Sequence, residues 1–330
     1  MISRLFLSVM WIIKIFSINR RIPIKLIHAQ DTGYAGLSAL VLGKLLRIPI
    51  VVSSHGIRHK TIQSSIGGRL NKLLIRIEYA LDTFIVKNVK NVTVVNSSIK
   101  NYYEQIIHNK VVDVIPIPIK LDEFKFSIVS IDKIRRELGI DKKAKVIGFV
   151  GRLSPEKNLL TLLVSFANLA QEDPLMKLVI VGSGPLESQL KDYISKREIR
   201  NKVIFCGTRN DIDKVLSSFD IFVLPSYTEG LSTALLEAMA CRRAVICSDI
   251  PANHVLVKNN QEGLLVNPYN PKELQQAIKS LCNDEPLRDK LGHNASIKAS
   301  EYDEDKVFNV ILKYYDDIII KERAHKCKSS

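Results

Sequence analysis

The sequence predicts an α/β protein made of two doubly wound domains, each with a parallel β-sheet covered by helices on both faces. Short β-rich runs alternate with helix-forming runs along most of the chain, which is the pattern of parallel sheets. Several predicted strands run directly into turns that carry glycine, histidine or basic residues, where open sheets of this kind bind ligands. With 330 residues, the chain is long enough to bury two hydrophobic cores.

The amino-acid composition indicates an ordered globular protein. Apolar residues make up 46% and charged residues 25% of the chain, which is ordinary for a globular protein and disfavours a disordered one. The five cysteines are odd in number and lack the spacing of a metal site, so we expect reduced thiols, an intracellular protein and no metal. We expect it in the cytoplasm or at the inner face of the membrane.

The positive charge is concentrated in the first part of the chain. The net charge is +14, and residues 1–125 hold 18 basic and 7 acidic residues, a net +11. Such a surface favours an anionic partner: a phospholipid membrane, a lipid phosphate or nucleic acid. The sequence has no helix-turn-helix, zinc-finger or RNA-binding pattern, so nucleic acid is the weakest of these hypotheses.

The first predicted element is a helix around the apolar run Leu5–Ile13, which is too short to span a membrane. It is either a buried helix, which we favour, or an interfacial helix with cations such as Lys14 near lipid headgroups. Strands are predicted over Lys25–Ala29 and Pro49–Ser53, with a helix over Tyr34–Leu46 between them.

The strand that ends at Ser53 runs into Ser-His-Gly, which places His55 at the carboxyl end of a strand as a candidate ligand contact. A basic helix follows over Gly68–Val89, with Arg69, Lys72 and Arg76 on one face. That face is either solvated or docked on anionic lipid. Two more strands, predicted over Asn91–Asn96 and Val111–Ile115, complete the first domain, residues 1–125.

The second domain, residues 126–305, begins with a predicted helix over Ile131–Leu138 and a strand over Lys145–Val150. That strand runs into a turn bracketed by Arg152 and Lys157, which could hold a diphosphate through a forked guanidinium and an ammonium. A helix over Leu159–Ala170 and a strand over Lys177–Val181 come next, and the strand meets a turn with Gly182 and Gly184. This turn lacks the third glycine of a dinucleotide fingerprint, so a nicotinamide cofactor is not indicated.

The stretch Ser226–Cys241 is the centre of the predicted site. Glu229 should lie in a turn and Glu237 on the following helix, with Gly230, Leu231 and Ser232 at the start of that helix. Helix starts offer backbone N–H groups and a positive dipole end to an anion such as a diphosphate. The remaining predicted elements are strands at 203–206, 221–225 and 244–248, and helices at 211–218, 272–282, 286–299 and from residue 305, the last with apolar residues Val307, Val310, Ile311, Tyr314 and Ile318 on one face.

Several of these segments together resemble the retaining glycosyltransferases of family four. The motifs are SSHG, VIGFVGRLSPEKN, LVIVGSGP, VIFCGT, DIFVLPSYTEGLSTALLEAMAC and EGLLVNP. The resemblance implies the GT-B fold, with two Rossmann-like domains facing a cleft, and transfer of a sugar from a nucleotide diphosphate sugar, UDP- or GDP-linked, without a metal or other cofactor. The acceptor would be a lipid-linked sugar or a polysaccharide.

The same resemblance implies roles for the candidate residues. Arg152 and Lys157 would hold the diphosphate, and Glu229 would engage the sugar. Glu237 would bind the ribose, and His55 would touch the sugar near the reacting carbon. Backbone N–H groups of Gly230, Leu231 and Ser232 would contact sugar and phosphate, the turn with Gly182 and Gly184 would border the nucleotide, and the helix over 306–330 would pack back on the first, acceptor-side domain.

The chain also departs from the family pattern. The first strands of the first domain and their glycine-rich turn have no counterpart, and Arg242 and Arg243 stand where glycine and proline are usual. We expect these arginines to be surface replacements and not ligands. An alternative function is therefore a catalytically impaired remnant that binds nucleotide, or a subunit that depends on a partner chain.

Overall fold

The computed structural model describes residues 2–57, 59, 69–107, 111–124 and 128–329, and within these the side chains of residues 2–9, 69–71, 128–130 and 325–329 are not described. The chain divides into two compact units, which we call the first unit (Met1–Ile117 with Asp305–Ser330) and the second unit (Pro118–Glu304). By this division the border follows Ile117, whereas the sequence placed it after residue 125.

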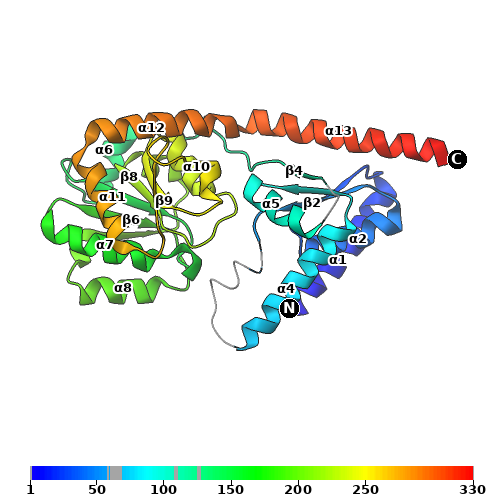
Figure 1. The fold of residues 1–330 in the computed structure, drawn as a ribbon, viewed down its shortest axis with the longest axis horizontal. Helices are drawn as coiled ribbons and strands as arrows, with labels where there is room; N and C mark the ends of the chain where they lie inside the picture. The colour runs from blue at the N-terminus through cyan, green and yellow to red at the C-terminus, as the bar shows by residue number, and fades with distance from the viewer. Residues whose placement is uncertain (1, 58, 60–68, 108–110, 125–127, 330) are drawn as a thin grey trace. The chain divides into compact units, whose positions relative to one another are not determined.

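The first unit contains a parallel four-stranded sheet in the order β1-β2-β3-β4, as the sequence predicted (Figure 1). The central strand β2 is an apolar run whose Val51 and Val52 are fully buried, as expected for a strand covered on both faces. The strands are β1 (Ile27–Ala29), β2 (Ile50–Ser54), β3 (Asn91–Val94) and β4 (Val112–Val114), and the helices are α1 (Ile2–Arg21), α2 (Tyr34–Leu46), α4 (Arg69–Asn88), α5 (Ser97–Ile106) and α13 (Glu304–Ser329).

The N-terminal helix α1 is not the buried helix that we favoured. It packs against α2, and Ile12 and Ile15 are partly covered, but the side chains of Trp11 and Ile13 are 55% and 63% exposed. In the described part of this helix, apolar residues lie on more than one side, whereas α2 packs against one side of it. The expectation of burial is therefore wrong for the described part of α1.

The C-terminal helix α13 is anchored to the first unit by side chains on one face. Tyr314 hydrogen-bonds Asp113 on β4, beside which α13 runs in Figure 1, and Glu322 pairs with Lys90 at 3.3 Å. Val307 and Ile318 are buried on this face, as predicted, but Val310 is 52% exposed. In a helix with 3.6 residues per turn, residues 307, 311, 314 and 318 lie on one face. Residue 310 lies outside that face and is therefore exposed.

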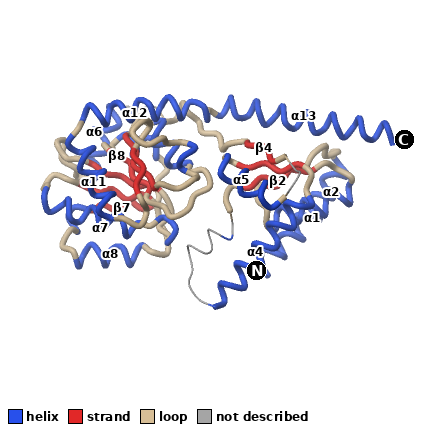
Figure 2. The backbone as a smooth tube through the Cα atoms, in the orientation of Figure 1, coloured by secondary structure: helices blue, strands red, loops and turns tan. Residues whose placement is uncertain are grey.

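The second unit contains a parallel six-stranded sheet in the order β10-β9-β8-β5-β6-β7, with helices on both faces (Figure 2). The strands are β5 (Val146–Val150), β6 (Lys177–Val181), β7 (Val203–Gly207), β8 (Ile221–Leu224), β9 (Ala244–Ser248) and β10 (Leu264–Val266). The helices are α6 (Ile128–Glu137), α7 (Leu159–Glu172), α8 (Glu187–Lys196), α9 (Ile212–Ser217), α10 (Thr233–Ala240), α11 (Pro271–Asn283) and α12 (Glu285–Ala299), with 3₁₀ turns at Pro155–Lys157, Arg200–Lys202, Asn253–Val255 and Ser300–Tyr302.

The core of the second unit explains a glycine in the middle of a strand. A Cβ on Gly148 of β5 would lie 2.0 Å from the Phe219 ring, so only glycine admits this fully buried phenylalanine against the strand. The sequence did not assign α5, α8 or β10. Strand β10 is three residues long, which is too short to show the two-residue alternation that predicts a strand. Among the described strands it pairs only with β9.

Candidate functional site

The candidate residues of the second unit follow the carboxyl ends of neighbouring strands. Arg152 comes two residues after β5, Gly182 directly after β6, and Glu229 in the turn between β8 and α10. Because all six strands are parallel, these ends meet at one edge of the sheet, where ligands of open α/β sheets bind. The fold therefore brings these three residues to a common edge.

The closest contact in this group joins Lys157 to Glu229. The Lys157 Nζ lies 2.7 Å from Glu229 Oε1, and the side chains are 20% and 8% exposed. An ammonium carries three N–H donors, so the one that Glu229 accepts leaves two for other acceptors such as phosphate oxygens. The pair holds a cation and an acid in fixed positions at the ligand edge.

A buried asparagine fixes the turn that carries Lys157. The Asn158 side-chain nitrogen donates to the carbonyls of Pro225 at 3.0 Å and Pro268 at 2.8 Å, and its oxygen accepts from the Thr161 hydroxyl at 2.8 Å. Its backbone has a φ of 52°, in the left-handed region that asparagine tolerates better than most residues. Asn158 thereby ties three loops together next to Lys157, a role that the sequence analysis missed although the residue lies in the quoted motif.

The glycine turn after β6 packs on the turn after β5. A Cβ on Gly182 would lie 2.0 Å from the Gly151 carbonyl oxygen, and one on Gly184 would lie 2.3 Å from that of Leu153. Leu153 in turn donates its N–H to the Ser183 carbonyl at 2.9 Å. The two glycines thus permit close approach of the chain to itself, which fixes the backbone on both sides of the exposed Arg152.

Helix α10 begins where the sequence predicted. Ser232 is its N-cap and accepts a hydrogen bond from the Leu235 N–H at 3.3 Å, and the side chains of Leu231 and Ser232 are buried. Gly230 and Glu229 lie in the turn before it, and Glu237 lies on the helix. The order of acid, helix start and second acid is therefore present in the structure.

Burial raises the pKa of Glu237 above the ordinary value for a glutamate. If its carboxylate accepts hydrogen bonds from ribose hydroxyls, protonation as the pH falls removes an acceptor, and this occurs at a higher pH than for an exposed glutamate. We therefore expect the KM for a nucleotide donor to rise as the pH falls through this pKa. Glu237→Gln should raise the KM at neutral pH and flatten its dependence on pH; a KM in the wild-type protein that is constant across the acid range would contradict this role.

His55 lies in the first unit, directly after β2, as predicted. Its Nε2 is 2.8 Å from Gln30 Oε1, and Gln30 follows the adjacent strand β1. Burial lowers the pKa of His55, and the charge of Asp31 opposes this shift. His28 on β1 is a second histidine beside Gln30, and the sequence analysis did not single it out.

Arg243 is not the surface replacement that we expected. Its guanidinium donates to the carbonyls of Cys241 at 2.9 Å and Phe219 at 2.7 Å, and burial lowers its pKa. The side chain joins the end of α10 to the end of α9, where helix carbonyls lack partners within the helix. Arg242 is exposed, with a φ of 56°. The motif alone does not predict these contacts of the partly buried Arg243, because they depend on packing between two helices.

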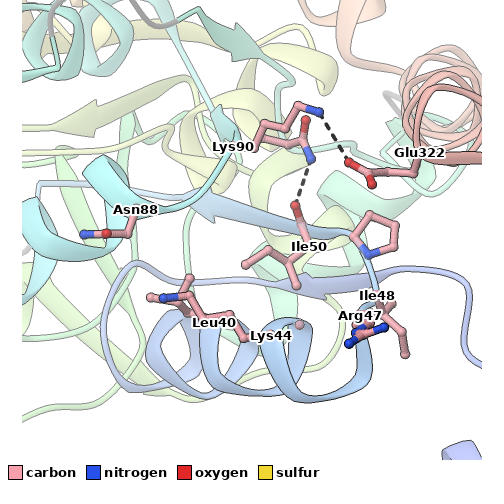
Figure 3. A pocket seen from close by; sticks show the side chains of 11 residues that line it. Leu40, Lys44, Arg47, Ile48, Ile50, Asn88, Lys90 and Glu322 are labelled. Atoms are coloured by element: carbon pink, nitrogen blue, oxygen red, sulfur yellow. Dashed lines mark hydrogen bonds and ion pairs between the residues drawn. The ribbon is translucent and has the colours of Figure 1, made fainter. Parts of the chain in front are cut away.

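A pocket of about 320 Å³ lies at the other edge of the first sheet, at the amino ends of β2 and β3 (Figure 3). Lys44, Arg47, Lys90 and Glu322 are among the residues that line it. It contains none of the predicted site residues.

Among the described residues, no group of three or more His, Cys, Asp or Glu side chains is placed to hold a metal ion. No helix in the described part of the chain is both long enough and apolar enough to cross a membrane.

Comparisons with known families match both parts of the chain. The family described as Glycosyl transferases group 1 matches residues 130–298, which is just over half of the chain, and Glycosyltransferase Family 4 matches residues 2–123.

Individual relatives extend the match. The chain is 27% identical over 300 residues to the N-acetylgalactosamine-N,N'-diacetylbacillosaminyl-diphospho-undecaprenol 4-alpha-N-acetylgalactosaminyltransferase of Campylobacter jejuni, covering 90% of this chain and 77% of that protein. It is 28% identical over 267 residues to the UDP-Gal:alpha-D-GlcNAc-diphosphoundecaprenol alpha-1,3-galactosyltransferase of Escherichia coli, covering 79% and 66%. The structure of Anabaena HepE in complex with UDP-glucose is 22% identical, with a TM-score of 0.80, and covers 93% of this chain and 82% of HepE.

Proposed function

The chain belongs to the group 1 glycosyl transferases, and from this we propose that it moves a sugar from a nucleotide diphosphate sugar to a lipid-linked or polysaccharide acceptor with retention of configuration. Its fold is GT-B, with two Rossmann-like parallel sheets, as the sequence analysis expected. The observation that carries the proposal is the Lys157–Glu229 pair at the carboxyl edge of the second sheet.

The proposed chemistry is electrostatic. As the bond between sugar and diphosphate breaks, negative charge develops on the leaving phosphate oxygens. Arg152, Lys157 and the backbone N–H groups at the start of α10 would stabilise that charge from fixed positions, without a required divalent ion. Glu229 would accept hydrogen bonds from the hydroxyl groups of the sugar and would also orient Lys157. We propose no covalent sugar intermediate, because none of the quoted motifs places a second carboxylate as the nucleophile.

The donor and acceptor classes rest on the relatives. The Escherichia coli relative is named for UDP-Gal, and both curated relatives are named for diphospho-undecaprenol acceptors. These names support a UDP-linked donor and a lipid-linked acceptor for this chain, which would then act at the cytoplasmic face of a membrane. The rival function is a protein that binds nucleotide without transferring sugar.

Incubation with radiolabelled UDP- and GDP-sugars and a membrane extract tests the proposal, with EDTA added in a parallel reaction. We expect label to enter the lipid or polysaccharide fraction, with or without EDTA. Calorimetry with UDP and GDP identifies the rival: nucleotide binding together with no transfer or hydrolysis of any donor would favour the binding protein.

We also propose that the first unit docks on an anionic membrane through α1. The exposed residues from Met10 to Arg21 are apolar, cationic or small and polar, with no acid among them. Lys14 lies over the Trp11 ring at 5.6 Å and Arg20 over the Phe16 ring at 5.0 Å, so the cations accompany the aromatic side chains. Aromatic and apolar residues beside cations are typical of interfacial helices. On α4, Lys72 and Arg76 are exposed as well, whereas the side chain of Arg69 lies outside the described residues.

Trp11 is the only tryptophan of the chain, so its fluorescence reports on this docking directly. We expect a blue shift with vesicles that contain phosphatidylglycerol and none with phosphatidylcholine alone. Because each cation near an anionic surface is worth about 1 kcal/mol, Arg20→Glu with Arg21→Glu should weaken vesicle binding by at least about 10-fold. The control is Lys133→Glu with Lys143→Glu, which makes the same charge change on the second unit; equal losses in both variants would contradict docking through α1.

A further inference from the structure

Two histidines and a glutamine form a hydrogen-bonded group at the carboxyl edge of the first sheet. His28 lies on β1, Gln30 follows β1, and His55 follows β2. The two strands are adjacent and parallel, with Ala29 opposite Val52, so their ends lie side by side. The Gln30 amide lies between the rings: Oε1 is 2.8 Å from His55 Nε2, and Nε2 is 3.3 Å from His28 Nδ1.

Both ring nitrogens of His28 have polar partners. Its Nε2 lies 2.6 Å from the Ser53 hydroxyl, which is itself bonded to Thr93 in the sheet, and its Nδ1 contacts the Tyr315 hydroxyl of α13. Burial and the nearby His55 lower the pKa of His28 to about 4, so this ring is neutral. A neutral imidazole has one acceptor nitrogen, and the Gln30 NH₂ group lies within reach of both, 3.3 Å from Nδ1 and 3.5 Å from Nε2.

The orientation of Gln30 follows from this arrangement. With its NH₂ group toward an acceptor on His28, the amide presents its carbonyl oxygen to His55. A carbonyl oxygen can only accept, so His55 Nε2 must carry the proton. A neutral His55 that is protonated on Nε2 has Nδ1 as its one acceptor.

We propose that Gln30 is a positioning residue that holds the His55 ring in the tautomer protonated on Nε2, so that Nδ1 accepts a hydrogen bond from a hydroxyl of a sugar substrate at the carboxyl edge of the first sheet. This inference rests on the proposed function, because it assigns an atom to the sugar contact of that reaction. The chain of contacts begins in the sheet at Ser53, passes through His28 and Gln30, and ends at His55. No bond is made or broken by Gln30 itself.

Three variants test this role. Gln30→Met removes the acceptor, and we expect kcat to fall about 10- to 100-fold with little change in the donor KM, because the sugar loses its alignment. Gln30→Glu keeps an oxygen acceptor but adds a negative charge, which raises the pKa of His55 further than the charge of Asp31 already does. Doubly protonated His55 has no acceptor, so activity should be retained at high pH and lost on acidification at a higher pH than in the wild type. Gln171→Met, an exposed glutamine on α7, is the control.

The tautomer itself is measured by ¹⁵N NMR of the histidine-labelled protein, with the His55 signals identified by their loss in His55→Ala. We expect the wild type and Gln30→Glu at high pH to show a protonated Nε2 and an unprotonated Nδ1, and Gln30→Met to show a mixture. An unchanged tautomer or an unchanged kcat in Gln30→Met overturns the role of Gln30. An inactive wild type that binds nucleotide overturns the proposed function instead, and the NMR measurement still decides the tautomer.

Discussion

Glu229→Ala is expected to lower kcat for sugar transfer by at least about 10²- to 10³-fold while the protein stays folded. The variant removes the group proposed to hold the sugar and also the partner that keeps Lys157 in place at 2.7 Å. Glu229→Gln should retain part of the activity if hydrogen bonding to the sugar dominates, because the amide still offers an oxygen. The measurement is single-turnover transfer of a radiolabelled donor sugar.

The coupling between the two residues can be separated from their individual effects. If Lys157 and Glu229 act as a unit, Lys157→Met with Glu229→Ala should lose little more activity than Glu229→Ala alone. A matched control is Glu172→Ala, which breaks an exposed pair with Lys279 in the same unit and should change neither activity nor stability by more than about 0.5 kcal/mol. Full activity in Glu229→Ala would remove Glu229 from the mechanism.

Asn158→Ala is expected to lower the free energy of unfolding by about 3–5 kcal/mol, a large loss for a single substitution. It leaves the buried carbonyls of Pro225 and Pro268 without their donor, each at a cost of about 1–3 kcal/mol. Alanine is also strained at a φ of 52° by about 1–2 kcal/mol, a contribution that Asn158→Gly avoids. We therefore expect Asn158→Gly to be more stable than Asn158→Ala by about that difference.

Asn158→Asp distinguishes the loss of the two donated hydrogen bonds from a change in side-chain volume. It keeps the volume but presents carboxylate oxygens to the two carbonyls, so it should be at least as unstable as Asn158→Ala at neutral pH and recover partly in acid. Urea unfolding followed by circular dichroism measures these differences. Asn168→Ala removes a surface amide bonded to Gln275 and serves as the control, with an expected change within about 0.5 kcal/mol. A small loss in Asn158→Ala would contradict the role of Asn158 as the tie between the loops.

The prediction of secondary structure succeeded where the period of the sequence was clear. Helix α2 and strands β6 and β9 have the predicted bounds, because an apolar run and its flanking turns determine them locally. Three short elements, α5, α8 and β10, were not assigned, and the burial expected for α1 was wrong. Apolar side chains indicate that a helix prefers an apolar contact, but they do not indicate which surface provides it.

The site shows the same division. The motifs predicted that Arg152, Lys157 and Glu229 reach one edge of the sheet, because parallel strands bring their carboxyl ends together whatever the details of packing. The role of Glu237 in the same site stays a prediction. The motifs could not predict that Asn158 would bond two prolines far along the chain, or that Gln30 would lie between two histidines. These contacts depend on distances of about 3 Å between loops, which vary with every side chain packed beneath them.

The amino-acid sequence by itself determined the order of the elements, the parallel sheets and the residues that reach their ligand-binding edges, since these follow from local periodicity and from the handedness of strand–helix–strand units. Only the tertiary structure decided which of these residues touch, which are buried and which protonation states they hold. Hydrogen bonding and burial are set by neighbours that are distant in sequence, so they exist only once the chain has folded.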